Sequence, residues 1–139
     1  MPDKETVELS LSQLKRASDI TGFIPAYIDI GDYNGAVNRA YYAVFHAIKA
    51  VELLDNYDSK KHSGLIARFR QEYIKTGIID VKYSDMIQDL SQFRNDSDYN
   101  ILAVITLSDA QEQYANAKDF VSMIDDYIKM RLDIKQKMR

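Results

Sequence analysis

The chain has 139 residues, a formal net charge of −3, 46% hydrophobic residues and no cysteine. This length predicts one domain, and the lack of cysteine excludes disulfides, thiolate metal sites and cysteine nucleophiles. The near-balanced charge does not indicate nucleic-acid binding over the whole surface, so any basic site must be local.

No apolar run approaches the about 18 residues of a membrane span, and the first ten residues contain no signal-peptide core. We therefore expect no membrane association and a cytoplasmic protein. Residues 1–139 are expected to form a single helical domain, with a basic C-terminal tail at about 133–139. Five glycines and two prolines are few, which favours an all-helical chain.

Apolar residues recur every three to four positions along most of the chain, which predicts amphipathic helices. The first predicted helix covers about 5–30, but Gly22 and Pro25 interrupt it. Because proline removes a helical hydrogen bond, this segment is either one kinked helix or two shorter ones. Asp32 is placed to cap a second helix at about 33–55.

Three further helices are predicted in the second half of the chain. The third covers about 63–75 and ends at Gly77, a residue suited to a left-handed closing position. The fourth covers about 80–98, and Arg94 stands where its apolar stripe continues. The fifth covers about 107–132. Short connections between long helices predict an all-α, up-and-down bundle of four to five helices, with the third helix across one end.

The second predicted helix is amphipathic in an unusual way. One arc is apolar and predicted to be core: Val37, Ala40, Tyr41, Val44, Ile48 and Val51. The roughly opposite arc is polar and aromatic: Asn38, Arg39, Tyr42, His46 and Lys49. That polar arc is interpreted either as a second buried surface, with hydrogen-bonded tyrosine and histidine, or as a functional site.

Two further polar clusters have both an ordinary and a functional interpretation. Lys61, His62 and Ser63 begin the third helix, either as a cap in which Ser63 accepts from backbone amides or as a phosphate-binding helix start. Arg94 and Asp98 are one helical turn apart, which indicates a surface ion pair or a site. A guanidinium at the edge of a core is costly unless a partner or ligand compensates it.

The segments GDYNGAVNRAYYAVFHAIKAVELL, KKHSGLIARFRQEYIKTG and FRNDSDY follow one another in the chain. In this order they resemble the HEPN domain family, in particular small stand-alone members with NRAYYAxFHA and RxxxDY patterns. The resemblance implies a four-to-five-helix bundle that is usually a homodimer. It also implies a toxin-like ribonuclease or a nucleotide-binding partner, often encoded beside a minimal nucleotidyltransferase.

Catalytic members carry an arginine followed, after four to six residues, by a histidine, and two copies of this motif meet at the dimer interface. Carried onto this chain, the arginine is Arg94, and Tyr99 stands near the histidine position. RNA cleavage through the 2′-hydroxyl needs a proton acceptor and a cation. Tyrosine, with a reference pKa near 10, is a poor base, so Asp98 or His46 would have to replace the histidine.

Three functions therefore remain as alternatives. The first is a metal-independent endoribonuclease of a nucleotidyltransferase-linked toxin–antitoxin system, without cofactor, with Arg94, Asp98 and Tyr99 as catalytic residues. The second is a non-catalytic dimer that binds a nucleotide or RNA as the accessory partner of a nucleotidyltransferase, and the third is a purely structural dimer. For the first two, the predicted nucleotide- or RNA-binding residues are Arg39, Tyr42, His46, Lys61 and His62. In the polar arc, Arg39, Tyr42 and His46 are expected to face Arg94, and no metal ligands are predicted.

Overall fold

The computed structural model describes residues 2–137, with the side chains of residues 2–133. This part of the chain contains α-helices, one π-helical turn and no strand, which confirms the all-α prediction. The α-helices are α1 (Lys4–Asp29), α2 (Tyr33–Leu54), α3 (His62–Phe69), α4 (Lys82–Tyr99) and α5 (Leu107–Lys137), and the π-helical turn is Arg70–Ile74. Within the described residues, none of the helices is both long and apolar enough to cross a membrane.

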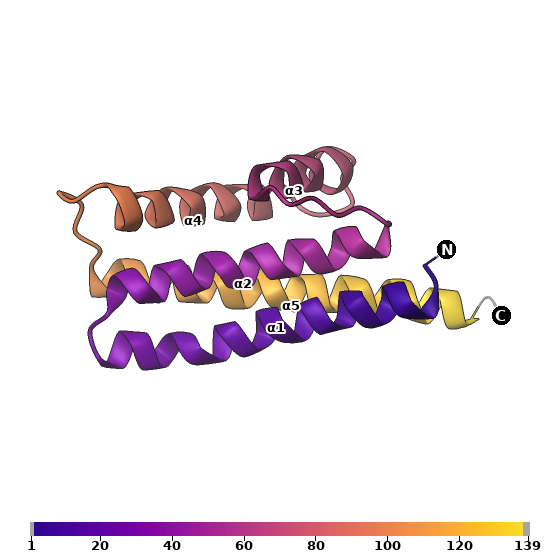
Figure 1. The fold of residues 1–139 in the computed structure, drawn as a ribbon, viewed down its shortest axis with the longest axis horizontal. Helices are drawn as coiled ribbons and strands as arrows, with labels where there is room; N and C mark the ends of the chain where they lie inside the picture. The colour runs from indigo at the N-terminus through magenta and orange to yellow at the C-terminus, as the bar shows by residue number, and fades with distance from the viewer. Residues whose placement is uncertain (1, 138–139) are drawn as a thin grey trace.

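The four long helices α1, α2, α4 and α5 alternate in direction, as predicted for an up-and-down bundle (Figure 1). The short helix α3 lies at the end of the bundle where α1 begins (Figure 1). The central helix is α2, because it contacts α1, α3, α4 and α5. Few faces of α2 are therefore left to solvent, and its polar residues must meet neighbouring helices.

The first two helices are joined by a tight turn. α1 is continuous through Pro25, so the alternative of two shorter helices is wrong. Gly31 adopts a φ of +78°, a left-handed conformation that glycine reaches without steric cost. Asp32 caps α2 as predicted, because its Oδ1 accepts a hydrogen bond of 2.8 Å from the backbone N–H of Gly35.

The third helix differs from its prediction at both ends. It begins at His62, one residue early, and Lys61 at the N-cap makes no side-chain capping hydrogen bond. The interpretation of Ser63 as the cap is therefore wrong, because Ser63 lies inside the first turn. After Phe69 the helix widens into the π-helical turn, and Gly77, with a φ of +78°, closes the segment as predicted.

The connection between α4 and α5 ends in a reciprocal cap. The N–H of Thr106 donates to Asp109 Oδ2 at 3.0 Å, and the N–H of Asp109 donates to Thr106 Oγ1 at 3.1 Å. α5 continues to Lys137 rather than about 132, so much of the predicted basic tail is helical. The side chains of residues 134–139, and residues 138–139 altogether, lie outside the described part.

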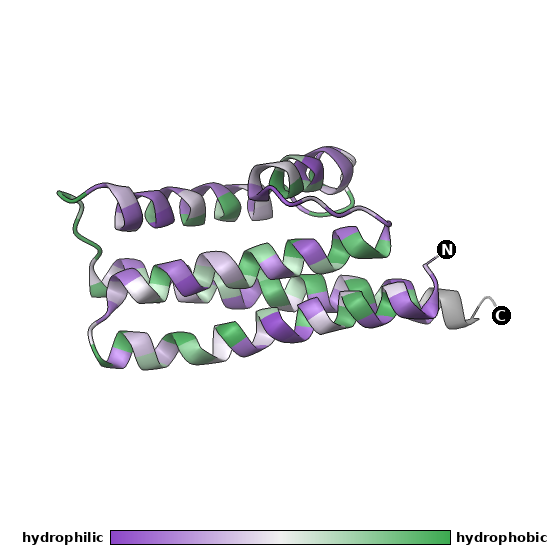
Figure 2. Cartoon of the chain, viewed as in Figure 1, coloured by the Kyte–Doolittle hydropathy of each residue, from purple (hydrophilic) through white to green (hydrophobic). Residues whose placement is uncertain are grey.

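The loop after α4 is apolar yet exposed. Ile101, Leu102 and Val104 are 98%, 86% and 81% exposed. Figure 2 shows this loop in green at the tip of the bundle beyond the C-terminal end of α4. Of the apolar residues in this connection, these three therefore lie outside the core, whereas Ile105 is buried.

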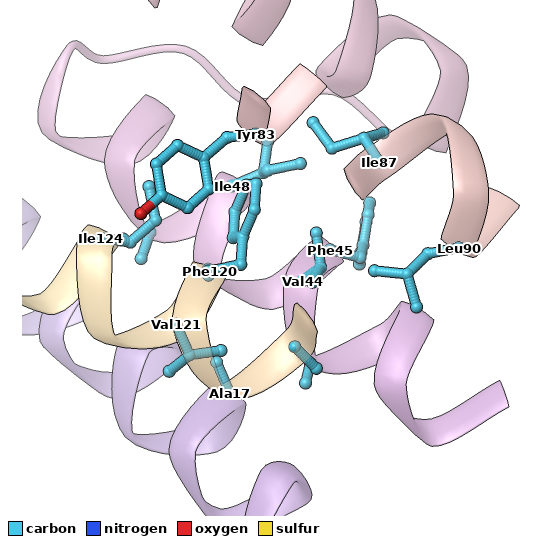
Figure 3. Close-up of a cluster of buried hydrophobic side chains, with 14 of the residues drawn as sticks. Ala17, Val44, Phe45, Ile48, Tyr83, Ile87, Leu90, Phe120, Val121 and Ile124 are labelled. Carbon is cyan, nitrogen blue, oxygen red and sulfur yellow. The ribbon is translucent and has the colours of Figure 1, made fainter. Parts of the chain in front are cut away.

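One core cluster is shared by the helices. The predicted apolar arc of α2 is buried: Val37, Ala40, Tyr41, Val44, Ile48 and Val51. Phe120 of α5 is fully buried, and its ring centroid lies 5.7 Å from those of Phe69 and Tyr83. Figure 3 shows Phe120 beside Tyr83, with side chains from α2, α4 and α5 around it.

Candidate functional site

Polar and aromatic side chains meet where α2 packs against α4 and the start of α3. We call this group the Arg94 cluster; it consists of Asn38, Tyr41, Tyr42, Phe45, His62, Arg94 and Asp98. Arg94 reaches α2 because it continues the face of α4 that buries Tyr83, Ile87 and Leu90.

The guanidinium of Arg94 lies against two tyrosine rings. Its Cζ is 4.7 Å from the ring centroid of Tyr41 and 5.4 Å from that of Tyr42, within the range of cation–π attraction. Its Nη2 donates to the Tyr42 hydroxyl at 3.3 Å. The predicted contact between Tyr42 of the polar arc and the end of α4 is therefore present.

Arg94 is incompletely compensated by the protein. Its Nε lies 3.7 Å from Asp98 Oδ2, and the side chains of Arg94 and Asp98 are 23% and 29% exposed. That Nε is buried and makes no hydrogen bond to any described residue. Asp98 is shared, because its Oδ1 also accepts from Asn38 Nδ2 at 3.3 Å. The rest of the Arg94 side chain is partly exposed, and a half-buried cation that solvent can reach suits an anionic ligand.

Arg94 keeps its charge in this position. Burial alone would lower the pKa of its guanidinium, but the hydroxyls of Tyr42 and Tyr41, together with Asp98, outweigh it and raise the pKa above its ordinary value. Burial raises the pKa of Tyr41, although Arg94 opposes this rise. The cluster therefore combines a permanent cation with a Tyr41 hydroxyl that is neutral at neutral pH.

His62 lies on the same aromatic surface as Arg94. Its ring stacks on Phe45, with centroids 3.8 Å apart and an interplanar angle of 18°. Its Nδ1 is 3.4 Å from the hydroxyl of Tyr41, and its ring meets Tyr42 edge-on at 5.9 Å. Burial lowers the pKa of His62, and the positive charge of Arg94 lowers it further.

Arg39 and His46 of the polar arc do not join this cluster. Arg39 Nε donates to the hydroxyl of Tyr27 on α1 at 3.2 Å. His46 Nδ1 is 2.7 Å from Gln13 Oε1, also on α1. Burial, followed by the charge of Arg16, lowers the pKa of His46 to about 4.

The expectation that Arg39 and His46 face the end of α4 is therefore wrong. The reason is angular, because neighbouring helix residues point about 100° apart. The polar arc of α2 is wide enough to meet two helices. Asn38 and Tyr42 meet α4, whereas Arg39 and His46 meet α1.

Two other predicted site residues lie at the margin. Tyr99, the last residue of α4, is 75% exposed and makes no hydrogen bond or ring contact with the Arg94 cluster among the described residues. Lys61 is exposed at the N-cap of α3, next to His62. Both side chains are accessible from solvent.

Sequence reasoning missed the part played by Tyr41. It was assigned to the core, and it is indeed only 5% exposed. Its ring nevertheless lies under Arg94, and its hydroxyl reaches His62. The sequence does contain a signal for this role, because the adjacent Tyr41 and Tyr42 place two hydroxyls at the edges of one helix face. Burial of a tyrosine ring leaves its hydroxyl in need of a partner.

Other parts of the molecule offer less chemistry. In the part of the chain that the structure describes, no three His, Asp or Glu side chains are grouped so that they could hold a metal ion. A surface cavity of about 680 Å³ lies between α1 and α5, and its lining includes Leu14, Thr21 and Val121 but no member of the Arg94 cluster.

Comparison with known proteins identifies similar sequences. The HEPN domain family matches residues 26–127. A protein of Methanocaldococcus jannaschii named "Putative toxin MJ0142" is 31% identical over 96 residues, which are 69% of this chain and 65% of that protein. A UPF0332 protein of Thermotoga maritima is 30% identical over 68% of this chain and 72% of its own length.

A UPF0332 protein of Archaeoglobus fulgidus matches over a longer region. It is 31% identical over 122 residues, which are 83% of this chain and 96% of that protein. The coverage of the relatives is uneven, since the chain spans just under two thirds, 65%, of the M. jannaschii protein. The matched region 26–127 contains α2, α3, α4 and the whole Arg94 cluster.

Proposed function

The chain belongs to the HEPN domain family, and on that premise we propose that it is a toxin-like protein that acts on RNA as a metal-independent endoribonuclease. The observation that carries this proposal is the half-buried guanidinium of Arg94, which lies on two tyrosine rings and is partly exposed to solvent. The name of the M. jannaschii relative, which describes a toxin, supports the toxin-like role.

In the proposed reaction, the ribose 2′-oxygen attacks the adjacent phosphorus and charge builds up on the phosphoryl oxygens. Arg94 stabilises that charge, because a preorganised cation away from bulk water needs little rearrangement during the reaction. The carboxylate of Asp98 lies 3.7 Å from Nε of Arg94 and helps to position it. Tyr99 follows Asp98 in the chain, and its exposed side chain can contact RNA. Lys61 supplies a further positive charge for the RNA backbone.

We also propose that the protein acts as a homodimer and has a small nucleotidyltransferase as its antitoxin partner. The support is the family resemblance of the NRAYYAVFHA and RNDSDY segments. Co-purification of the protein with the product of a neighbouring nucleotidyltransferase gene would be the direct test. A protein that stays monomeric at micromolar concentration would contradict the dimer.

A second candidate function is binding without cleavage, in which the Arg94 cluster holds a nucleotide or an RNA end. It is favoured by Tyr99, which stands near the position of the histidine that catalytic family members carry. A tyrosine accepts a proton poorly near neutral pH. The two candidates share Arg94 as the anion-binding group and differ only in whether the bound RNA is cut.

The test is cleavage of RNA by the purified protein in EDTA, with Arg94→Ala and, as a charge-matched control, Arg16→Ala. Arg16 is an exposed arginine of α1, outside the cluster. We expect the wild type and Arg16→Ala to cleave, and Arg94→Ala to lose about 10²–10³-fold in rate, because one charge-stabilising group is removed.

Each result decides between the candidates. Equal cleavage by wild type and Arg94→Ala would contradict the role of Arg94. Binding of RNA that depends on Arg94, without cleavage by any variant, would support the second candidate. Neither binding nor cleavage by the wild type would reject both.

A further inference from the structure

We propose that His62, at the start of α3, is the base that takes the proton of the ribose 2′-hydroxyl when RNA is bound at the Arg94 cluster. This inference rests on the proposed ribonuclease function and assigns its base to a residue outside the FRNDSDY segment. The carrying observation is that His62 and Arg94 pack on the same two tyrosine rings. A cation and an imidazole on one surface are the two groups that cleavage through a 2′-hydroxyl requires.

The alternative bases are less well placed. The chain contains only two histidines, and His46 has its Nδ1 bound to Gln13 on the α1 side of α2. Asp98 is held between Arg94 and Asn38, so both of its carboxylate oxygens already face donors of the protein. Tyr99 makes no contact that would activate its hydroxyl among the described residues.

The ring of His62 is held so that one nitrogen remains available. Phe45 covers one face of the ring, Tyr42 meets it edge-on, and the Tyr41 hydroxyl lies 3.4 Å from Nδ1. Nε2 makes no hydrogen bond to the described residues, and the side chain is half-buried rather than enclosed. When Nδ1–H donates to the Tyr41 hydroxyl, Nε2 carries the lone pair that accepts a proton.

The step balances without any further reactant. Nε2 of His62 takes the proton of the ribose 2′-hydroxyl while the 2′-oxygen forms its bond to phosphorus. The bond between phosphorus and the 5′-oxygen of the next nucleotide breaks, and that oxygen leaves with the electron pair and takes a proton from water. The products are a 2′,3′-cyclic phosphate and a 5′-hydroxyl, and the imidazolium returns its proton to solvent.

The charges around His62 favour its neutral form before RNA binds. The titratable and charged groups that face it are Tyr41, Tyr42, His46 and Lys49 of α2, Lys61 beside it, and Arg94 of α4. Burial, Arg94 and Lys49 all lower its pKa, so the imidazole is unprotonated at neutral pH. A bound phosphate would offset these positive charges and raise the pKa, which gives a signal that is independent of cleavage.

The first experiment compares His62→Gln with Gln71→Ala, a change at an exposed residue of the π-helical turn that follows α3. Glutamine keeps a hydrogen-bonding group near Tyr41 but does not accept a proton at neutral pH. We expect His62→Gln to lose about 10²–10⁴-fold in the rate of RNA cleavage and to lose the acidic limb of the pH–rate profile. Gln71→Ala should keep both, and a 2′-deoxy oligonucleotide should still bind to all three proteins, because Arg94 is intact in each.

The second experiment follows the two histidine ring signals by NMR while an uncleavable 2′-deoxy oligonucleotide is added, with His62→Gln to assign them. We expect the signal of His62 to shift and its pKa to rise, and the signal of His46, whose Nδ1 is held by Gln13, to shift less. The proposal would be overturned if the His62 signal did not shift during binding, or if His62→Gln cleaved RNA at the wild-type rate.

The failures of the two proposals differ. If His62→Gln cleaves like the wild type and Arg94→Ala does not, the role of His62 is rejected and the ribonuclease function stands. If the wild type binds RNA without cleaving it, the proton-transferring role is rejected together with the ribonuclease, and the binding function remains. If it neither binds nor cleaves, all of them are rejected.

Discussion

At the scale of single residues, the contacts that a side chain makes determine its chemistry more than its residue type does. Arg39 and Arg94 both contact tyrosine, but Arg39 is exposed and bonded to Tyr27, whereas Arg94 is half-buried with an unused Nε. Only the second places a partly exposed cation in a protected position, where an anionic ligand would be held more strongly than at an exposed side chain. The two histidines differ in the same way, since His46 ties α2 to α1 and His62 lies beside the cation.

A second residue-scale feature lies outside the candidate site. Glu52 of α2 is fully buried, and neither carboxyl oxygen makes a hydrogen bond to the described residues. Its nearest cation is Arg68, whose Nε is 3.7 Å from Oε1. Burial raises the pKa of Glu52 to about 8, and the charge of Arg68 offsets this only in part.

This carboxyl makes folding stability depend on pH. In the unfolded chain it ionises near its ordinary pKa of 4.5, so the folded protein holds more protons between about 4.5 and 8. The free energy of unfolding should therefore fall as pH rises through this window and level off above it. We expect Glu52→Gln to exceed the wild type in stability at pH 8, by on the order of 2 kcal/mol, and by less at pH 5.

Urea unfolding of both proteins at the two pH values measures this difference. Arg68 retains its contacts with the Tyr57 ring, 4.3 Å away, and with Glu72 in the variant. A stability difference that does not change between pH 5 and pH 8 would show that Glu52 is ionised in the folded protein throughout.

At the scale of elements, the turn between α1 and α2 determines which side of α1 faces Arg39 of α2. Gly35, in the first turn of α2, packs so closely on Tyr27 that an added Cβ would lie 2.7 Å from its Cδ1. The same Cβ would meet the capping carboxylate of Asp32. The glycine is therefore required by the close approach of the two helices.

Two glycine substitutions should change stability in opposite directions. Gly35→Ala should destabilise the protein by about 1–3 kcal/mol, because it forces apart Tyr27 and the cap. Gly22→Ala, inside α1, meets no atom within 4 Å and should stabilise it by about 0.5–1 kcal/mol, the difference in helix propensity. Thermal unfolding measures both, and stabilisation by Gly35→Ala would mean that the turn adapts freely.

At the scale of the whole molecule, one core connects the helices that carry the site. Phe120 of α5 contacts Phe69 of α3 and Tyr83 of α4, so it joins the segments on which His62 and Arg94 lie (Figure 3). A rigid connection of this kind keeps an imidazole and a guanidinium on one surface although they come from different helices.

Truncation of this central ring should weaken the entire fold. Phe120→Ala should reduce the free energy of unfolding by about 3–5 kcal/mol, because it removes a buried ring and leaves a cavity. Phe23→Ala, at a side chain that is 63% exposed, should change it by less than about 0.5 kcal/mol. Denaturant unfolding distinguishes them, and a small effect of Phe120→Ala would mean that α3 and α4 pack independently of α5.

Local patterns in the sequence predicted the helices, their order, the caps at Asp32 and Gly77, and the apolar arc of α2. These follow from helical periodicity and turn chemistry, which depend on residues close together in the chain. The sequence also predicted that Arg94 lies at the edge of the core, because this arginine interrupts the regular apolar stripe of α4.

The polar residues that meet one another are determined by how the helices pack. Arg39 and His46 turn toward α1 while Tyr42 turns toward α4, because a polar arc that spans about 100° touches two neighbouring helices at once. The approach of His62 to the rings that hold Arg94 depends on how α3 packs against α2. Helical periodicity does not predict that packing, because the packing is determined by the volumes of side chains from distant parts of the chain.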